Sequence, residues 1–337
     1  MEQQILCDKP KIAVFITGGT ILSSLDRKSG KVTPKYNGKE LLRSVTKICD
    51  NYSIEGIEVL SIPGSELTLD HGLDLLRRVK GKLKEKDIHG IVVVQGTDTL
   101  DEISYLFHLL LNPVKPVVFT GSMKSAHDLY SDMKGNLVGA IQTAGSKQSK
   151  KHGVLVYMNE TIFSAADVNK AHANRMDAFQ SFWGPLGMTR NGDVVYFRHL
   201  DDYETFNIHK MEVKVPIIKV YSSMDTSLLE MCIEQKVDGI VIEGFGSGNV
   251  PSYLVPVIER ALKNNIVVIV TTRCFDGASL GEYNYEGGGG QLEKLNVIFA
   301  GILSSQKARI KLMVLLAAGK NREEIHMVFK RNRVQKT

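Results

Sequence analysis

The first half of the chain alternates short apolar runs with longer amphipathic stretches. Four of the runs are rich in β-branched residues and are almost free of polar ones: Ile12–Thr17, Gly90–Gln95, Pro116–Thr120 and Gly153–Met158. Runs of this kind are typical of parallel strands that are covered on both faces. We therefore expect them to form the centre of a buried sheet, with Ile57–Ser61 as a further strand.

The stretches between these runs have the spacing of amphipathic helices. Leu69–Lys86 repeats leucine and valine along one face, from Leu73 to Leu83, and similar patterns cover Leu100–Leu111 and Asp132–Ala144. Strands that alternate with helices in this way indicate a doubly wound α/β fold.

The second half of the chain repeats the alternation after a polar interruption. His199–Lys210 has little periodicity, and apolar runs return at Pro216–Val220, Gly239–Glu243 and Ile266–Thr271. The fold class that this pattern predicts is α/β with two α/β domains. Residues 1–200 would form the larger N-terminal catalytic domain around a parallel sheet, 201–214 a linker, and 215–337 a smaller C-terminal α/β domain.

Composition and charge narrow the class of protein. The chain has 337 residues, of which 43% are hydrophobic and 23% charged, as expected for a globular protein in water. A net charge of +5 over so many residues gives little reason to expect a nucleic acid partner. No apolar run is long enough for a transmembrane helix or a signal peptide, so we expect no membrane partner.

The cysteine and histidine positions argue against a metal site. The four cysteines, Cys7, Cys49, Cys232 and Cys274, lie far apart and show no metal-ligand spacing with the histidines. Free thiols are typical of a reducing compartment, so we expect a cytoplasmic protein that needs no metal.

Polar and glycine-rich segments follow several of the predicted strands, where open parallel sheets bind ligands. Thr17–Ile21 contains two glycines, which allow close approach of a ligand, and presents the hydroxyl of Thr20. Pro63–Glu66 offers the hydroxyl of Ser65 and the carboxylate of Glu66 after another strand.

A third segment, Gln95–Glu102, follows the strand Gly90–Gln95. Thr99 and Glu102 have the spacing of a capping box, which predicts that a helix starts there. Thr97 and Asp98 then lie just outside the helix, where a hydroxyl and a carboxylate would be free to act on a ligand.

A threonine nucleophile needs a neighbouring base, and no histidine stands at these strand ends. A lysine paired with a carboxylate would serve instead, and spacing alone leaves Lys124 and Lys170 as alternatives. A glycine-rich segment in the second half, Gly244–Asn249, is a weak candidate for a phosphate site because no acidic partner follows at the usual distance.

The motifs Thr17–Ile21 and Gly96–Thr99 together resemble the bacterial and archaeal L-asparaginases, in particular the cytoplasmic members. The resemblance covers nearly the whole chain and includes Gly64–Glu66 and Asp167–Lys170. It implies an amidohydrolase that converts L-asparagine to L-aspartate and ammonia, with weaker activity on L-glutamine, without metal or organic cofactor, as a homodimer or homotetramer.

The resemblance also implies catalytic roles. The family's nucleophile falls on Thr20, which attacks the side-chain amide carbon of the substrate. Its second threonine, aspartate and lysine fall on Thr97, Asp98 and Lys170, and the family context of Asp167–Lys170 selects Lys170 rather than Lys124.

The substrate-binding residues that it implies are Ser65 and Glu66 for the α-carboxylate and α-amine, Asp98 for the α-ammonium, and the backbone of Gly19 and Gly96. A zwitterionic amino acid requires such a combination of an anion with hydroxyl and N–H donors.

The sequence departs from the family at two places. Gln95 stands where the family usually has a histidine. The family commonly carries a tyrosine in the loop after the first motif. In this sequence the matching position falls at Lys31 or Val32, and the nearest tyrosine is Tyr36. A neighbouring subunit is expected to contribute the following residues: Asn249, Tyr283, Tyr285 and Glu286.

Three alternatives remain beside this interpretation. The same motifs occur in an asparaginase-like subunit of a tRNA-dependent amidotransferase, but that protein has an extra N-terminal domain, for which a first strand starting by Lys11 leaves no room. The departures at Gln95 and at the loop tyrosine suit a non-catalytic amino-acid sensor. A nucleotide-dependent enzyme would use Gly244–Gly248.

Overall fold

The structure is a computed structural model that describes residues 9–26, 31–34, 38–126, 128–150, 152–199 and 204–331. The chain divides into two compact units, Met1–Thr205 and Phe206–Thr337. The boundary falls within the stretch interpreted from sequence as a linker, and each unit has its own α/β architecture.

Unit 1 is built around an eight-stranded sheet of described residues with the order β12-β11-β8-β7-β6-β5-β1-β4. Its strands are β1 (Lys11–Gly18), β4 (Ser53–Ile62), β5 (Ile88–Val94), β6 (Val117–Thr120), β7 (Val154–Met158), β8 (Thr161–Ser164), β11 (Gly187–Arg190) and β12 (Asp193–Tyr196). The strands from β4 to β7 are parallel, as the apolar runs predict, whereas β8, β11 and β12 are antiparallel to their neighbours.

The antiparallel edge of this sheet begins at a tight turn. Asn159 and Glu160 both have positive φ angles, 51° and 61°, and form the two-residue connection between β7 and β8. Such a turn reverses the chain within the sheet, where a parallel neighbour would need a crossover helix. The strands beyond β7 are only four residues long, and β11 and β12 are also partly exposed, so they lack the apolar runs from which the other strands were predicted.

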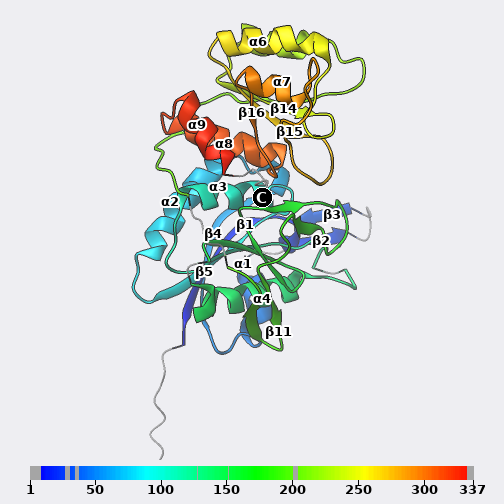
Figure 1. Cartoon of the computed structure of the whole chain (residues 1–337). Coiled ribbons are helices and arrows are strands. Elements are labelled where there is room, and N and C mark those ends of the chain that lie inside the picture. The colour runs from blue at the N-terminus through cyan, green and yellow to red at the C-terminus, as the bar shows by residue number, and fades with distance from the viewer. Residues whose placement is uncertain are drawn as a thin grey trace, which may run out of the picture. The chain divides into compact units, whose positions relative to one another are not determined.

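Helices cover both faces of the sheet of unit 1, above and below it in Figure 1. These helices are α1 (Gly38–Thr46), α2 (Leu69–Leu83), α3 (Leu100–Leu110) and α4 (Met133–Gly145). Val14 and Val92 pack with α1 and α4 in one core cluster. On the opposite face the ring of Phe119 meets that of Phe107 on α3 edge to face, with the centroids 4.9 Å apart.

Two small antiparallel pairs belong to the described part of unit 1. One pairs β2 (Ser23–Asp26) with β3 (Lys31–Pro34), and the other pairs β9 (Val168–Lys170) with β10 (Phe179–Ser181). The second pair was not expected from sequence, because three residues are too few to show a period.

Unit 2 contains a parallel sheet with the order β13-β14-β15-β16. Its strands are β13 (Ile217–Lys219), β14 (Gly239–Gly244), β15 (Val267–Thr272) and β16 (Ile298–Phe299). Its helices are α5 (Ser227–Glu234), α6 (Val255–Lys263), α7 (Gly289–Lys294), α8 (Ser305–Ala317) and α9 (Arg322–Lys330). Together the units confirm the predicted class of a larger and a smaller α/β domain. In the described part of the chain, every helix is too short or too polar to cross a bilayer.

Candidate active site

The predicted chemical segments of unit 1 leave the sheet at one edge. Strand β1 lies between β4 and β5, and β5 pairs with β6, all in parallel. The loops that follow β1, β4, β5 and β6 therefore start side by side at the carboxyl ends of the strands. These loops carry Thr20, Ser65, Thr97 and Gly121 respectively.

Three glycines hold the first three of these loops in backbone contact. A Cβ on Gly19, whose φ is +94°, would lie 2.4 Å from the Cα of Gly96. A Cβ on Gly96 would lie 2.5 Å from the Cα of Gly64. No side chain fits at these contacts, so glycine is required for the loops to approach this closely. The contact brings Thr20, Ser65 and Thr97, each the next residue after one of these glycines, to one place.

The loop after β6 closes the other side of Thr97. A Cβ on Gly121 would lie 2.5 Å from the carbonyl oxygen of Gln95 and 3.1 Å from the Cγ2 of Thr97. Thr97 itself is 5% exposed, so its hydroxyl is almost fully removed from bulk water. Ser65 and Glu66, in a short 3-10 helix (Gly64–Glu66), are exposed and open to a ligand.

Lys170 reaches Thr97 and Asp98 from β9. Its Nζ donates to Thr97 Oγ1 at 2.9 Å and to Asp98 Oδ1 at 2.7 Å. The Lys170 side chain is 16% exposed and that of Asp98 is 61% exposed, so the ion pair stands at the mouth of the site. A charged lysine donates to both oxygens, and a neutral lysine presents a lone pair to the threonine hydroxyl.

Lys124, the other candidate lysine, belongs to a different network. Its backbone N–H and that of Met123 donate to the carboxylate of Asp132, at 3.0 and 2.9 Å, and Ser122 Oγ donates to the same carboxylate at 2.7 Å. Asn136 Nδ2 adds a bond to Asp132 at 2.9 Å and another to the carbonyl of Gly121 at 3.0 Å. These bonds fix the loop after β6.

The capping box predicted for Thr99 and Glu102 is wrong in its hydrogen bonds. Helix α3 does begin at Leu100 after Thr99, but the Thr99 side chain makes no cap hydrogen bond. Its Oγ1 instead donates to the carbonyl of Gly64 at 2.8 Å and accepts from Gln95 Nε2 at 3.2 Å. The Gly64 carbonyl takes the hydroxyl proton, and Gln95 Nε2 rather than a helix N–H donates to the hydroxyl oxygen.

Asp101 is a site-supporting residue that the sequence interpretation missed. Its Oδ2 accepts the backbone N–H of Lys170 at 3.0 Å. The one available signal was the spacing of Asp98 and Asp101, which puts two carboxylates three residues apart at the start of a helix.

The residues expected to act from a neighbouring subunit belong to unit 2. Asn249 Oδ1 accepts the N–H of Gly289 at 3.0 Å and so holds the glycine-rich turn that follows Glu286. Tyr283 and Tyr285 are 50% and 53% exposed, with their ring centroids 5.8 Å apart.

Gly244–Asn249 forms a tight turn in which Phe245 bridges to Asn249. A Cβ on Gly248 would lie 3.0 Å from the ring of Phe299, so packing accounts for that glycine. Among the loop positions considered for the absent tyrosine, Tyr36 lies outside the described residues, and the side chains of Lys31 and Val32 are likewise outside the description.

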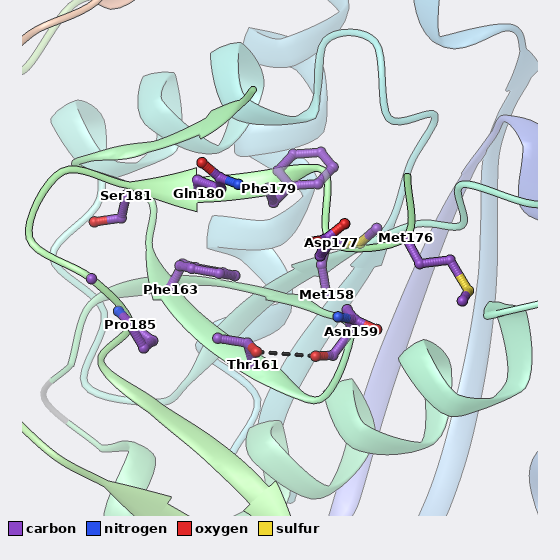
Figure 2. Close-up of a pocket in the computed structure, with 11 residues that line it drawn as sticks. Met158, Asn159, Thr161, Phe163, Met176, Asp177, Phe179, Gln180, Ser181 and Pro185 are labelled. Carbon is purple, nitrogen blue, oxygen red and sulfur yellow. Dashed lines mark hydrogen bonds between the residues drawn. The ribbon is translucent and has the colours of Figure 1, made fainter. Parts of the chain in front are cut away.

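A separate cavity of about 370 Å³ lies beside β10 (Figure 2). Its described lining includes Phe163, Phe179 and Ser181 but none of Thr20, Thr97, Asp98 or Lys170. Phe179 stands opposite Lys170 in the β9–β10 pair, so the cavity lies one strand away from the lysine. Within the described residues, the His, Cys, Asp and Glu side chains form no group of three or more suited to a metal ion.

Comparison with known proteins matches both units. A family model described as asparaginase, N-terminal, matches residues 11–202, and one described as glutaminase/asparaginase C-terminal domain matches residues 214–329. The chain is 32% identical over 311 residues to the L-asparaginase of Bacillus licheniformis, covering 92% of this chain and 96% of the relative.

Other relatives match over a similar share of the chain. A probable L-asparaginase of Deinococcus radiodurans is 34% identical over 329 residues, which cover 95% of this chain and 97% of the relative. A glutaminase-asparaginase of Pseudomonas fluorescens is 30% identical over 329 residues, 94% of this chain and 89% of the relative. A relative from Haemophilus influenzae, 30% identical over 334 residues (96% of this chain and 93% of the relative), is named a probable periplasmic L-asparaginase.

Proposed function

The chain belongs to the asparaginase family of amidohydrolases, and from this premise we propose that it hydrolyses L-asparagine to L-aspartate and ammonia. The observation that carries the proposal is the contact of Lys170 Nζ with both Thr97 and Asp98, beside three loops whose glycines touch. This arrangement supplies hydroxyls, a carboxylate and an amine at one sheet edge, which amide hydrolysis requires.

The exposed residues of the site suit an amino-acid substrate. Glu66 and Asp98 present carboxylates to an α-ammonium, and Ser65 presents a hydroxyl to an α-carboxylate. Backbone N–H groups near Gly19 and Gly96 are suited to the oxygen of the side-chain amide, on which negative charge develops during attack. The substrate would thus be held at both ends with its amide carbon between the threonines.

In the proposed reaction Thr20 Oγ1 attacks the amide carbon. An O–C bond forms, the C–N bond breaks, and the hydroxyl proton leaves with the amide nitrogen as ammonia. Water then adds to the resulting ester, one proton returns to Thr20 Oγ1, and L-aspartate leaves. Thr97, Asp98 and Lys170 move the protons in both steps, because Lys170 already contacts the other two.

The direct test is ammonia release from L-asparagine by the wild type, Thr20→Ala and Thr97→Val. Loss of turnover in both variants, with thermal unfolding unchanged, is the expected result. Binding of L-asparagine without turnover by the wild type would favour the amino-acid sensor. Ammonia release in the absence of tRNA would argue against the amidotransferase subunit.

L-Glutamine is a second candidate substrate. Some relatives are named glutaminase-asparaginase, and the two substrates differ by one methylene. A pocket discriminates one methylene by about 1–3 kcal/mol, so we expect detectable but weaker turnover of L-glutamine. Steady-state kinetics with both amides, at equal enzyme concentration, decide the preference.

We further propose a cytoplasmic homodimer or homotetramer in which Tyr283 or Tyr285 replaces the absent loop tyrosine across a subunit interface. Support comes from the exposure of both tyrosines and from free thiols at Cys49, Cys232 and Cys274. Sedimentation equilibrium tests the oligomeric state, and cell fractionation tests the location.

A further inference from the structure

The first turn of α3 bonds to two other parts of the candidate site. Thr97 and Asp98, just before the helix, contact the side chain of Lys170. Thr99 bonds to the loop after β4 through the carbonyl of Gly64, and Asp101 bonds to β9 through the backbone N–H of Lys170. These two bonds span 35 and 69 positions of the sequence.

We propose that Thr99 and Asp101 are positioning residues for separate parts of the reaction. Thr99 holds the loop that presents Ser65 and Glu66 to the substrate, whereas Asp101 holds the strand that presents Lys170 to Thr97. The inference rests on the proposed amide hydrolysis. It states which residues position the groups that bind the substrate and which position the groups that transfer protons.

The bond from Thr99 has a fixed direction. Gln95 is fully buried, and its Nε2 donates to Thr99 Oγ1. A hydroxyl has one proton, and that of Thr99 is directed to the carbonyl of Gly64. Since Gly64 also touches the backbone of Gly96, the hydroxyl and the glycine contact together determine where Ser65 lies. Loss of the hydroxyl releases one of these two constraints.

The bond from Asp101 supports a strand that has little support of its own. β9 has three residues and pairs with β10 in a two-stranded sheet. A two-stranded pair is marginally stable by itself. A carboxylate that accepts a backbone N–H makes a charge-assisted bond, which is stronger than one between neutral groups. Asp101 therefore fixes the backbone of Lys170 relative to α3, the same helix whose start carries Thr97 and Asp98.

The two roles predict opposite kinetic signatures. For Thr99→Val, we expect KM for L-asparagine and the dissociation constant of L-aspartate to rise about tenfold with kcat changed less than about twofold. For Asp101→Ala, we expect kcat to fall about tenfold or more, while the dissociation constant of L-aspartate stays within about twofold of wild type.

Conservative variants separate positioning from folding. Thr99→Ser keeps the hydroxyl and should restore most of the affinity that Thr99→Val loses. Asp101→Asn keeps an oxygen that accepts the Lys170 N–H and should restore most of the kcat that Asp101→Ala loses. Thr46→Val and Asp74→Ala serve as matched controls, because each of these side chains bonds within its own helix, Thr46 in α1 and Asp74 in α2. Isothermal titration with L-aspartate supplies a readout that is independent of turnover.

The outcomes distinguish this inference from the proposed function. A wild-type protein without amidohydrolase activity overturns the proposed function itself. An active wild type whose Thr99→Val and Asp101→Ala variants match it, or lose the same kinetic parameter, overturns the positioning roles alone. Thr99→Ser keeps the hydroxyl donor and Asp101→Asn keeps the oxygen acceptor on which the proposal depends. Failure of these two variants to restore function therefore also contradicts the positioning roles.

Discussion

The Nζ of Lys170 lies 2.9 Å from the Oγ1 of Thr97, although 73 positions of sequence separate the two residues. Thr97 lies in the loop that follows the buried parallel strand β5, whereas Lys170 ends a three-residue strand outside the main sheet. The threonine hydroxyl is buried and the aspartate beside it is exposed, so the lysine connects the interior of the site to its mouth. This relationship makes the role of the lysine directly testable.

Replacement of Lys170 by methionine should lower kcat for L-asparagine by about 10²- to 10⁴-fold, the usual range for loss of a group that transfers protons. Stability should change little. The Lys170 side chain is 16% exposed, but the pair opens to solvent at Asp98, which is 61% exposed, and a solvent-screened ion pair contributes about 0–1 kcal/mol. Ammonia release and the free energy of unfolding in urea measure the two effects.

Lys124→Met is the matched control for that experiment. Lys124 follows β6 and its backbone, rather than its ammonium, bonds to Asp132. We expect it to retain wild-type kcat within about threefold, the scatter of ordinary surface changes. Equal losses in the two lysine variants would contradict the assignment of Lys170.

Gly19→Ala should lower both stability and activity. The new methyl group would lie 2.4 Å from the Cα of Gly96, and the φ of +94° already disfavours a side chain. Backbone must move to relieve this contact, at a cost of about 1–3 kcal/mol in the free energy of unfolding. Urea denaturation measures the cost, and ammonia release measures the displacement of the loop that carries Thr20.

Gly81→Ala is expected to act in the opposite direction. Gly81 lies in α2, and a Cβ there would have no atom within 4 Å. Alanine should therefore raise the free energy of unfolding by about 0.5–1 kcal/mol and leave activity unchanged. If Gly81→Ala lost as much stability as Gly19→Ala, the close backbone contacts of Gly19 would not explain the loss of stability in Gly19→Ala.

The stability of unit 1 should depend on the protonation of His152. The ring stacks on Tyr196 at 3.9 Å and on His199 at 4.6 Å between centroids, and burial, followed by the charge of His199, lowers the pKa of His152 to about 4. Between the ordinary pKa of about 6.5 and the folded value, the unfolded chain binds a proton that the folded chain does not. Stability contributed by His152 is thus present above pH 6.5 and decreases as the pH falls towards 4.

His152→Phe keeps the stacked ring and removes the titration. The difference in melting temperature between wild type and this variant should change between pH 7 and pH 4.5, with the wild type losing more on acidification. Carboxylates that titrate in the same window cancel in the difference. A difference that does not vary with pH would contradict a depressed pKa at this position.

The cysteines should differ in reactivity towards iodoacetamide at pH 8. Burial, with a smaller contribution from Asp50, raises the pKa of Cys49 to about 11, and burial also raises the pKa of Cys232. Both thiols are therefore protonated and shielded, whereas Cys274 is exposed. Peptide mass spectrometry should find Cys274 alkylated in the native protein, and Cys49 and Cys232 only after unfolding in urea. If Cys49 were alkylated in the native protein as fast as Cys274, the burial of Cys49 would be contradicted.

The sequence predicts those parts of the fold whose burial leaves a local pattern. The strands β1 and β5 are buried on both faces and appear as unbroken apolar runs, and the segments with Thr20 and Thr97 are recognisable because they end such runs. Strand β9 has no comparable pattern, so spacing alone left Lys124 and Lys170 open, and the choice came from the family resemblance.

Contacts between distant residues explain the rest. Thr99 has the spacing of a local cap, but its hydroxyl bonds to Gly64, 35 positions away. The bond from Lys170 to Asp101 spans 69 positions. Neither partner can be read from the residues around it. The packing of Gly64 against Gly96 brings the first acceptor into range, and the placement of β9 beside the start of α3 brings Lys170 to Asp101.

The absent loop tyrosine leads to a prediction about subunit exchange. If Tyr283 or Tyr285 acts on Thr20 of a neighbouring subunit, the double variant Tyr283→Phe/Tyr285→Phe should lose kcat, and so should Thr20→Ala. Each variant alone forms assemblies in which every site lacks one group. The exposure of both tyrosines, 50% and 53%, leaves their hydroxyls available to another chain.

Co-expression of these two variants separates a shared site from a site within one chain. In a mixed dimer, the chain with intact Thr20 receives intact tyrosines from the Thr20→Ala chain, so one of the two sites is complete. Random pairing makes half of the dimers mixed, and activity should recover to about a quarter of the wild-type value. If the tyrosines serve the Thr20 of their own chain, no mixed assembly contains a complete site, and the mixture stays as inactive as its components. Recovery under co-expression therefore requires an interface at which one subunit completes the site of another.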